Sequence, residues 1–108
     1  MLDINTKDYG FDFEAVITTV QWQLKDDLKL THNCINSHGV ALLCKLDLRY
    51  LRRLNLSYNN IGYEGVAVIA GLECKYLKRF DISENPIGNK GIKALCSANW
   101  PNLTYLQI

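Results

Sequence analysis

His32, Cys34 and His38 form the part of this sequence that is best suited to bind a metal ion. Imidazole and thiolate groups are common zinc ligands, and here three of them stand within one short segment. The remaining cysteines are Cys44, Cys74 and Cys96. None of the four cysteines forms a C-x-x-C pair or another zinc-site spacing. We therefore predict free, structural thiols and no metal site, with a disulfide or a metal as the alternatives.

Catalytic chemistry has even less support in the sequence. There is no G-x-S-x-G nucleophile motif, no phosphate-binding P-loop and no dinucleotide-binding glycine pattern. The carboxylates are scattered and do not form a pair that could share general acid and base roles. We therefore predict that the chain is not an enzyme, with no catalytic residue and no cofactor.

The overall composition excludes several classes of partner. The 108 residues carry a formal net charge of +1, which argues against binding to nucleic acid or to an anionic membrane. No apolar run approaches the roughly 18 residues that a membrane-spanning helix needs. The N-terminal residues are partly acidic and lack the apolar stretch of a secretory signal. We expect a cytoplasmic protein, or one delivered into a host cytosol if it is a bacterial effector.

An internal repeat with an offset of 26 residues positions all of these side chains. Leu51, Leu54, Leu56, Asn59, Ile61, Gly62, Gly65 and Ile69 recur as Leu77, Phe80, Ile82, Asn85, Ile87, Gly88, Gly91 and Leu95. Most of these residues also recur 26 positions earlier, as Leu28, Leu30, Asn33, Ile35, Gly39 and Leu43. Half of another unit follows at the end, with Leu103, Leu106 and Ile108. A period between 20 and 50 residues indicates a solenoid of stacked units.

Each unit combines the periodicities of a strand and a helix. Alternating apolar residues such as Leu54 and Leu56 predict a short strand, and the apolar spacing in 63–72 predicts a helix. Stacked units would place a parallel sheet inside a curve and the helices outside it. We expect one domain, 1–108, with a degenerate first repeat or cap, three full repeats and the start of another. These are residues 1–24, 25–50, 51–76, 77–102 and 103–108.

The opening of each unit, L-x-x-L-x-L-x-x-N-x-I, resembles the signature of the leucine-rich repeat family. The N-x-I-G-x-x-G pattern, seen from Asn59 to Gly65 and from Asn85 to Gly91, is most similar to the ribonuclease-inhibitor-like and bacterial GALA-like repeats. The resemblance implies an α/β right-handed solenoid, a short horseshoe that binds proteins. Some relatives of this kind are inhibitors, and others recruit substrates for ubiquitin ligases.

The repeat register predicts that both histidines lie on the surface. His32 takes the position of Tyr58 and Glu84, at the exposed edge of the inner face, and His38 matches Glu64 at the start of a helix. This argues against a metal or catalytic role for either histidine.

Three other columns of the repeat are predicted to be structural. The asparagines should bond to backbone groups of the turn, with a row of ligand-binding amides as the alternative. The glycines should stand where close packing or an unusual backbone angle excludes a side chain at the start of a helix. A small column on the helical side should be buried. The columns are Asn33, Asn59 and Asn85; Gly39, Gly65 and Gly91; and Cys44, Ala70 and Cys96.

The inner face of the sheet is the predicted binding surface. One outward column reads Asp27, Arg53, Arg79 and Tyr105, and the next reads Asp3, Lys29, Asn55, Asp81 and Gln107. Arginine and tyrosine are enriched in binding hot spots. The predicted partner contacts are Arg53, Tyr58, Arg79, Asp81 and Tyr105. The alternative is that these are merely solvated positions of a twisted sheet.

The inner face alone is too small for a standard protein interface, and its last strand is uncapped. Five short strands about 4.8 Å apart offer on the order of 300 Å², whereas a standard interface buries about 800 Å² per partner. Flanking loops, a longer array or an oligomer would have to supply the rest. Residues 103–108 form an uncapped strand that could pair with another copy of the chain.

Aromatic and aliphatic residues at the two ends are predicted to cover the core. Trp22 and Trp100 precede strands and should pack against it. The first repeat could act as an N-terminal cap through Phe11, Phe13, Val16, Ile17, Val20 and Trp22.

The function predicted from the sequence is a non-enzymatic protein–protein interaction scaffold with an unidentified protein partner. One alternative is a structural or self-assembling module that forms homo-oligomers through its C-terminal edge. Another is a substrate-recruiting part of a larger ubiquitin-ligase-type or effector protein.

Overall fold

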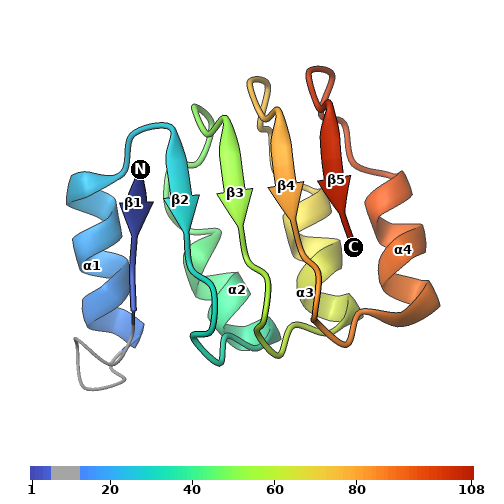
Figure 1. Ribbon diagram of the computed structural model, residues 1–108, viewed down its shortest axis with the longest axis horizontal. Helices are drawn as coiled ribbons and strands as arrows, with labels where there is room; N and C mark the ends of the chain where they lie inside the picture. Colours follow the sequence, from blue (N-terminus) through green and yellow to red (C-terminus); the bar gives the residue numbers. More distant parts are fainter. Residues whose placement is uncertain (6–12) are drawn as a thin grey trace.

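The computed structural model describes residues 1–5 and 13–108, in which strands and helices alternate. The strands are β1 (Leu2–Asp3), β2 (Asp27–Lys29), β3 (Arg53–Asn55), β4 (Arg79–Asp81) and β5 (Tyr105–Gln107). The helices are α1 (Phe13–Gln23), α2 (Ser37–Leu43), α3 (Tyr63–Ala70) and α4 (Gly88–Cys96). The strands form one parallel sheet in chain order, and the helices form a second layer behind it (Figure 1). The predicted α/β right-handed repeat solenoid is confirmed.

The strands pair in the register that the repeat predicts. Leu28 pairs with Leu54, Leu54 with Phe80, and Phe80 with Leu106. Leu28, Leu54 and Phe80 are buried in a continuous core between the sheet and the helices. Burying an aliphatic or aromatic side chain of this size stabilises the fold by roughly 1.5–3 kcal/mol, so this column is a major source of stability.

The asparagine column joins neighbouring units. The Oδ1 atom of Asn59 accepts a hydrogen bond from the backbone N–H of Ile35 at 3.1 Å. Its Nδ2 group donates to the carbonyl oxygens of Leu30 and Leu56, both at 2.9 Å. Asn85 forms the corresponding bonds one unit later. The predicted bonding to turn backbone is confirmed, and the structure adds that both asparagines also bond to the preceding unit.

Close packing explains the glycine column. A Cβ atom on Gly65 would lie 2.8 Å from Cγ2 of Ile61, and one on Gly91 would lie 2.6 Å from Cβ of Ile87. Real Cβ atoms essentially never approach a neighbour this closely. Neither glycine has a positive φ, so of the two predicted reasons close packing is the one that applies.

Of the two tryptophans, one is buried and the other is exposed. Trp100 is buried, packs edge-on against Phe80 and donates its Nε1–H to the carbonyl oxygen of Leu72 at 3.2 Å, as predicted for a core residue. The prediction for Trp22 is wrong, because its side chain is 81% exposed. Successive helical residues are rotated by about 100°, so Trp22 points away from the face on which Val20 is buried.

The N-terminal repeat otherwise covers the core as predicted. Val16 and Val20 are fully buried, and Phe13 and Ile17 pack against the core while partly buried. Phe11, the remaining aromatic residue of the predicted cap, lies outside the described residues.

All four cysteines are free, but they differ in exposure. Cys74 is buried, Cys44 is partly buried, and Cys34 and Cys96 are exposed. The prediction that Cys96 belongs to a buried column is wrong. Ala70, its equivalent in the preceding unit, is buried, whereas Cys96 lies at the end of α4, the last helix of the stack (Figure 1).

Candidate binding face

The sheet face opposite the helices brings most of the predicted contact residues together. A shallow hollow of about 350 Å³ lies over β2 to β5. Arg53, Arg79, Asp81 and Tyr105 all line it, whereas Tyr58 lies beyond its rim. The predicted site is therefore one surface for four of its five residues.

The first column of this face carries exposed cations in register. Arg53 pairs with Arg79 across β3 and β4, and Arg79 pairs with Tyr105 across β4 and β5. An Nη1 atom of Arg53 lies 4.0 Å from a carboxylate oxygen of Asp27. The guanidinium carbon of Arg79 lies 4.4 Å from the centre of the Tyr105 ring, a cation–π contact. The face therefore holds its arginines in defined positions while they stay accessible to a partner.

Asp81 has a local role that the sequence did not reveal. Its Oδ1 atom accepts hydrogen bonds from the backbone N–H of Ser83 at 2.9 Å and from the Ser83 hydroxyl at 2.6 Å. Asn55 makes the same pair of bonds with Ser57 one unit earlier. Asp81 therefore stabilises the turn after β4 in addition to lining the face.

Tyr58 belongs to a row of unusual backbone geometry. His32, Tyr58 and Glu84, at the carboxyl ends of the strands, have φ angles of 58°, 57° and 55°. The left-handed region is costly for residues other than glycine. The His32 and Tyr58 rings stack with their centres 4.5 Å apart. Both histidines lie at the surface, as predicted. Sequence alone indicates a positive φ only where glycine or asparagine stands, and neither occupies this column, so the geometry could not be predicted.

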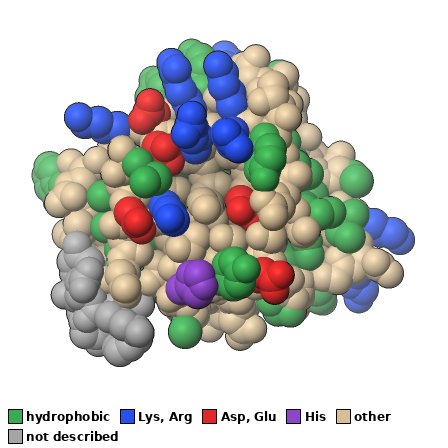
Figure 2. All heavy atoms as spheres, in the orientation of Figure 1, with side chains coloured by type: hydrophobic (Ala, Val, Ile, Leu, Met, Phe, Trp, Pro, Cys, Tyr) green, Lys and Arg blue, Asp and Glu red, His purple; other side chains and the backbone are tan. Residues whose placement is uncertain are grey.

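Four basic side chains at the start of β3 and β4 form a cluster of which only half was predicted. Arg52 and Lys78 precede the predicted Arg53 and Arg79, and all four are exposed. The signal was present as the doublets L-R-R-L and L-K-R-F at equivalent positions of two repeats. Figure 2 shows Lys and Arg side chains gathered at the top of this face.

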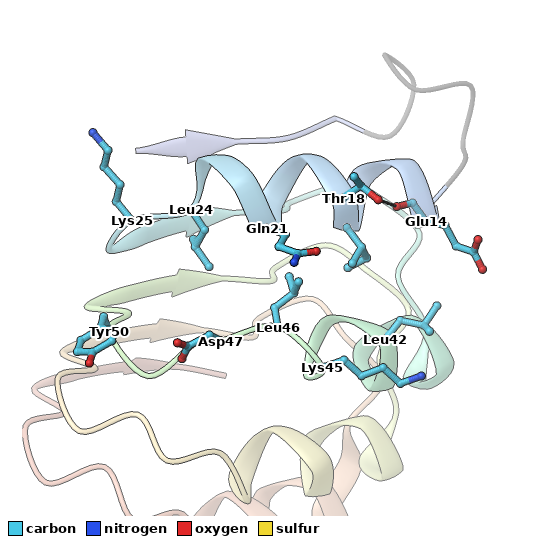
Figure 3. A pocket seen from close by; sticks show the side chains of 11 residues that line it. Glu14, Thr18, Gln21, Leu24, Lys25, Leu42, Lys45, Leu46, Asp47 and Tyr50 are labelled. Atoms are coloured by element: carbon cyan, nitrogen blue, oxygen red, sulfur yellow. Dashed lines mark hydrogen bonds between the residues drawn. The ribbon is translucent and has the colours of Figure 1, made fainter.

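A second hollow lies on the other layer, between α1 and α2. It has a volume of about 730 Å³, and Leu24, Leu42 and Leu46 contribute to its wall. Gln21 of α1 and Leu46 point toward one another across it (Figure 3). Glu14, Lys25, Lys45 and Asp47 are the charged residues of its lining. The hollow lies beside the contact between α1 and α2, and Val16 and Val20 of α1 belong to the common core.

Burial and hydrogen bonding perturb three side chains whose pKa values bear on chemistry. Burial raises the pKa of the Cys74 thiol to about 11, and burial together with the nearby Cys74 raises that of Cys44 to about 11. Both thiols are therefore protonated and unreactive at neutral pH. Arg49, which bonds both carboxylate oxygens of Asp47 at 2.9 Å, lowers the pKa of Asp47 to about 2.

In the described part of the chain, no three His, Cys, Asp or Glu side chains are placed to hold a metal ion. The same residues include no helix with the length and apolar character needed to span a membrane.

Residues 47–70 and 73–96 each match a family model described as Leucine Rich repeat. These segments contain β3 with α3 and β4 with α4, so the repeats recognised by the family model are those that carry the arginine column. No curated protein matches the chain.

A solved structure shares the fold. A chain from the "Structure of Chaetomium Mex67:Mtr2 subunits" superimposes with a TM-score of 0.67 and 24% sequence identity, over 97% of this chain and 78% of that one. At this identity the likeness shows the fold alone and carries no functional detail.

Proposed function

We propose that this chain is a non-enzymatic scaffold that binds another protein through the inner sheet face and the loops beside it. The observation that carries the proposal is the column of Arg53, Arg79 and Tyr105, held in register by β3, β4 and β5. All three side chains are exposed on the face that the helices leave uncovered. Arginine and tyrosine at fixed positions are typical of interface hot spots.

Features that oppose stability support the same proposal. Arginines directly opposite each other on adjacent strands repel, and Tyr58 is held at a positive φ that costs roughly 1–2 kcal/mol for a side chain other than glycine. Neither feature contributes to the core. Strain of this kind is common at binding sites, where the side chain is needed for contact.

The loops beside the sheet extend a face that would otherwise be small. Tyr58, which is 52% exposed, lies beyond the carboxyl end of β3, and Arg52 lies just before its start. A partner contacting both would cover more than the strands alone, whose area is on the order of 300 Å².

The proposed setting is the cytoplasm, because a reducing compartment keeps cysteines unpaired and all four are free. Kinship with the ribonuclease-inhibitor-like or GALA-like repeats, from the N-x-I-G-x-x-G pattern, is part of this proposal. A substrate-recruiting role within a larger ubiquitin-ligase-type or effector protein would use the same face.

Self-assembly through β5 is a second candidate function. Leu106 is 45% exposed, although Phe80, its equivalent in β4, is fully buried. β5 lies at the edge of the sheet, and a strand from another copy could pair with it and cover Leu106 and Ile108.

Site-specific photo-cross-linking distinguishes these functions. A p-benzoylphenylalanine would replace Tyr58 in the loop beside the inner face, Ile108 at the β5 edge, or Tyr63, an exposed tyrosine at the start of α3 that serves as the control. We expect adducts with a second protein from position 58 and not from position 63. Adducts of the chain with itself from position 108 would support self-assembly. Equal yields from positions 58 and 63 would contradict a role for the inner face.

A further inference from the structure

We propose that the amino-terminal edge of the inner face binds an acidic protein segment. The site is a cluster that we call the basic edge: Arg52, Arg53, Lys78 and Arg79. This inference rests on the proposed function and names the chemistry of the partner.

The backbone fixes the four basic residues side by side. Arg53 and Arg79 are paired across β3 and β4. The carbonyl oxygen of Arg52 accepts hydrogen bonds from the N–H groups of Lys78 at 2.8 Å and Arg79 at 3.1 Å. Since neighbouring parallel strands lie about 4.8 Å apart, the four cations occupy a compact patch. Lys and Arg side chains gather at the top of the face in Figure 2, where the strands begin.

Two carboxylates of the chain lie beside the basic edge, against its four cations: Asp26, which lines a hollow with Arg52, and Asp27. Among residues 1–5 and 13–108, the only ion pair of the basic edge joins Arg53 to Asp27, at 4.0 Å. The guanidinium carbon of Arg79 lies 4.4 Å from the centre of the Tyr105 ring, and this cation–π contact does not neutralise the charge of the guanidinium. Like charges on adjacent strands repel, so carboxylates from a partner would relieve a repulsion that folding leaves in place.

An aromatic pair beside the basic edge suits a peptide. The rings of Tyr50 and Tyr76 stack with their centres 6.1 Å apart, and they are 60% and 47% exposed. Both rings line a hollow of about 510 Å³ together with Lys25, Asp26 and Arg52, so two cations and one carboxylate share it. The rings offer apolar contact area while the neighbouring cations bind carboxylates, which is the combination found at many protein interfaces.

The surrounding charges favour a short acidic segment of a protein over a nucleic acid. Asp27, Asp81 and Glu84 interrupt the same face at and below the basic edge. A long phosphate backbone that followed the strands would meet these carboxylates, and the net charge of +1 offers it no wider basic surface. Two or three carboxylates match the size of the cluster.

Fluorescence anisotropy with purified full-length chain tests the proposal. The probes are a fluorescein-labelled decapeptide with three consecutive glutamates among glycines and tyrosines, its glutamine counterpart, and a ten-nucleotide deoxythymidine strand. The variant Arg52→Gln with Lys78→Gln removes two charges from the basic edge. The matched control, Lys90→Gln with Lys93→Gln, removes two charges from exposed positions of α4.

We expect the chain to prefer the glutamate peptide over the glutamine peptide by about tenfold or more at about 50 mM salt, and less at about 300 mM. The basic-edge variant should lose about tenfold in affinity, and the control should stay within about twofold. Equal losses in the two variants, no preference for glutamate, or tighter binding of the nucleic acid would each overturn the proposal.

The cross-linking experiment separates this inference from the function on which it rests. An inner-face adduct with a second protein that forms equally in the wild type and in the basic-edge variant would overturn the acidic-segment proposal alone. The absence of any inner-face adduct with a second protein would instead overturn the proposed function.

Discussion

Asparagine is the residue type that couples one unit of this solenoid to the next. The amide of Asn59 both accepts from and donates to backbone groups of the turns, and its bonds reach its own unit and the preceding one. Leaving a buried backbone group unpaired costs about 1–3 kcal/mol. The side chain therefore matters through the groups it satisfies.

Replacing Asn59 with alanine should lower the free energy of unfolding by about 2–4 kcal/mol, because the N–H groups of Asn33 and Ile35 lose the amide oxygen that accepts from them. Urea denaturation followed by circular dichroism measures the change. Asn60→Ala is the matched control, since Asn60 is exposed, and it should stay within about 0.5 kcal/mol of the wild type. Similar losses in the two variants would refute the coupling role.

The packing of helix α3 depends on the absence of a side chain at Gly65. Gly65 lies in the first turn of α3, where a Cβ would meet Ile61 at 2.8 Å and the Cα of Ser37 at 3.2 Å. This contact lets α3 approach α2 closely. Gly71 lies at the C-terminal end of α3, where an added Cβ would have no neighbour nearer than 3.5 Å.

Gly65→Ala should therefore destabilise the protein and Gly71→Ala should not. Alanine improves helix propensity by about 1 kcal/mol, but overpacking at position 65 costs about 1–3 kcal/mol, which leaves a net loss of up to about 2 kcal/mol. At position 71, where φ is −82°, the change should be neutral or slightly stabilising. Thermal unfolding of the two variants checks the difference in sign. A more stable Gly65→Ala variant would show that the close contact is not limiting.

Stability of the whole molecule should fall at alkaline pH because of its buried thiols. Cys44 and Cys74 have pKa values of about 11 in the folded chain, above the value of 9.0 for a free thiol. The unfolded chain therefore releases these protons first as the pH rises past about 9, which favours unfolding until about pH 11. The slope is at most about 1.4 kcal/mol per pH unit for each thiol.

Urea denaturation at several values between pH 8 and pH 11 measures this loss. The variant Cys44→Ala with Cys74→Ala should show a shallower decline than Cys34→Ala with Cys96→Ala, whose substituted thiols are exposed. The two variants share all other side chains, so only the difference between their declines counts. Parallel declines would contradict a contribution from the buried pair.

The period alone was enough to predict the sheet register, the buried leucine column and the exposed arginine column, because all three depend on positions repeating every 26 residues. Features outside the period were harder to predict. Trp22 lies in the degenerate first unit, where no neighbouring copy shows which helix face is buried. The burial of Cys96 was mispredicted for a related reason: it ends α4, the last helix in the described residues, and no further helix packs over it.

The period also predicted part of the candidate site and missed the rest. The column of Arg53 and Arg79 follows from register, but the bonds from Ser83 to Asp81 and the positive φ of Tyr58 depend on the path of the turn. Turn geometry is set by backbone hydrogen bonds, which residue types alone indicate only when glycine, proline or asparagine marks them.

Asn59 and Asn85 each bond to the same backbone positions of the preceding unit, so further units could be added to the solenoid with the same bonds. In a second copy of residues 51–76 inserted after position 76, the asparagine would donate to the carbonyl oxygen of the unit before it, as Asn59 and Asn85 do. The inserted unit's own carbonyl oxygen would accept from the asparagine of the unit after it. Its strand would lengthen the basic edge by another pair of arginines, the equivalents of Arg52 and Arg53. The valency of the scaffold for an acidic partner would then be set by the number of its units, and affinity could be graded without redesigning a single contact.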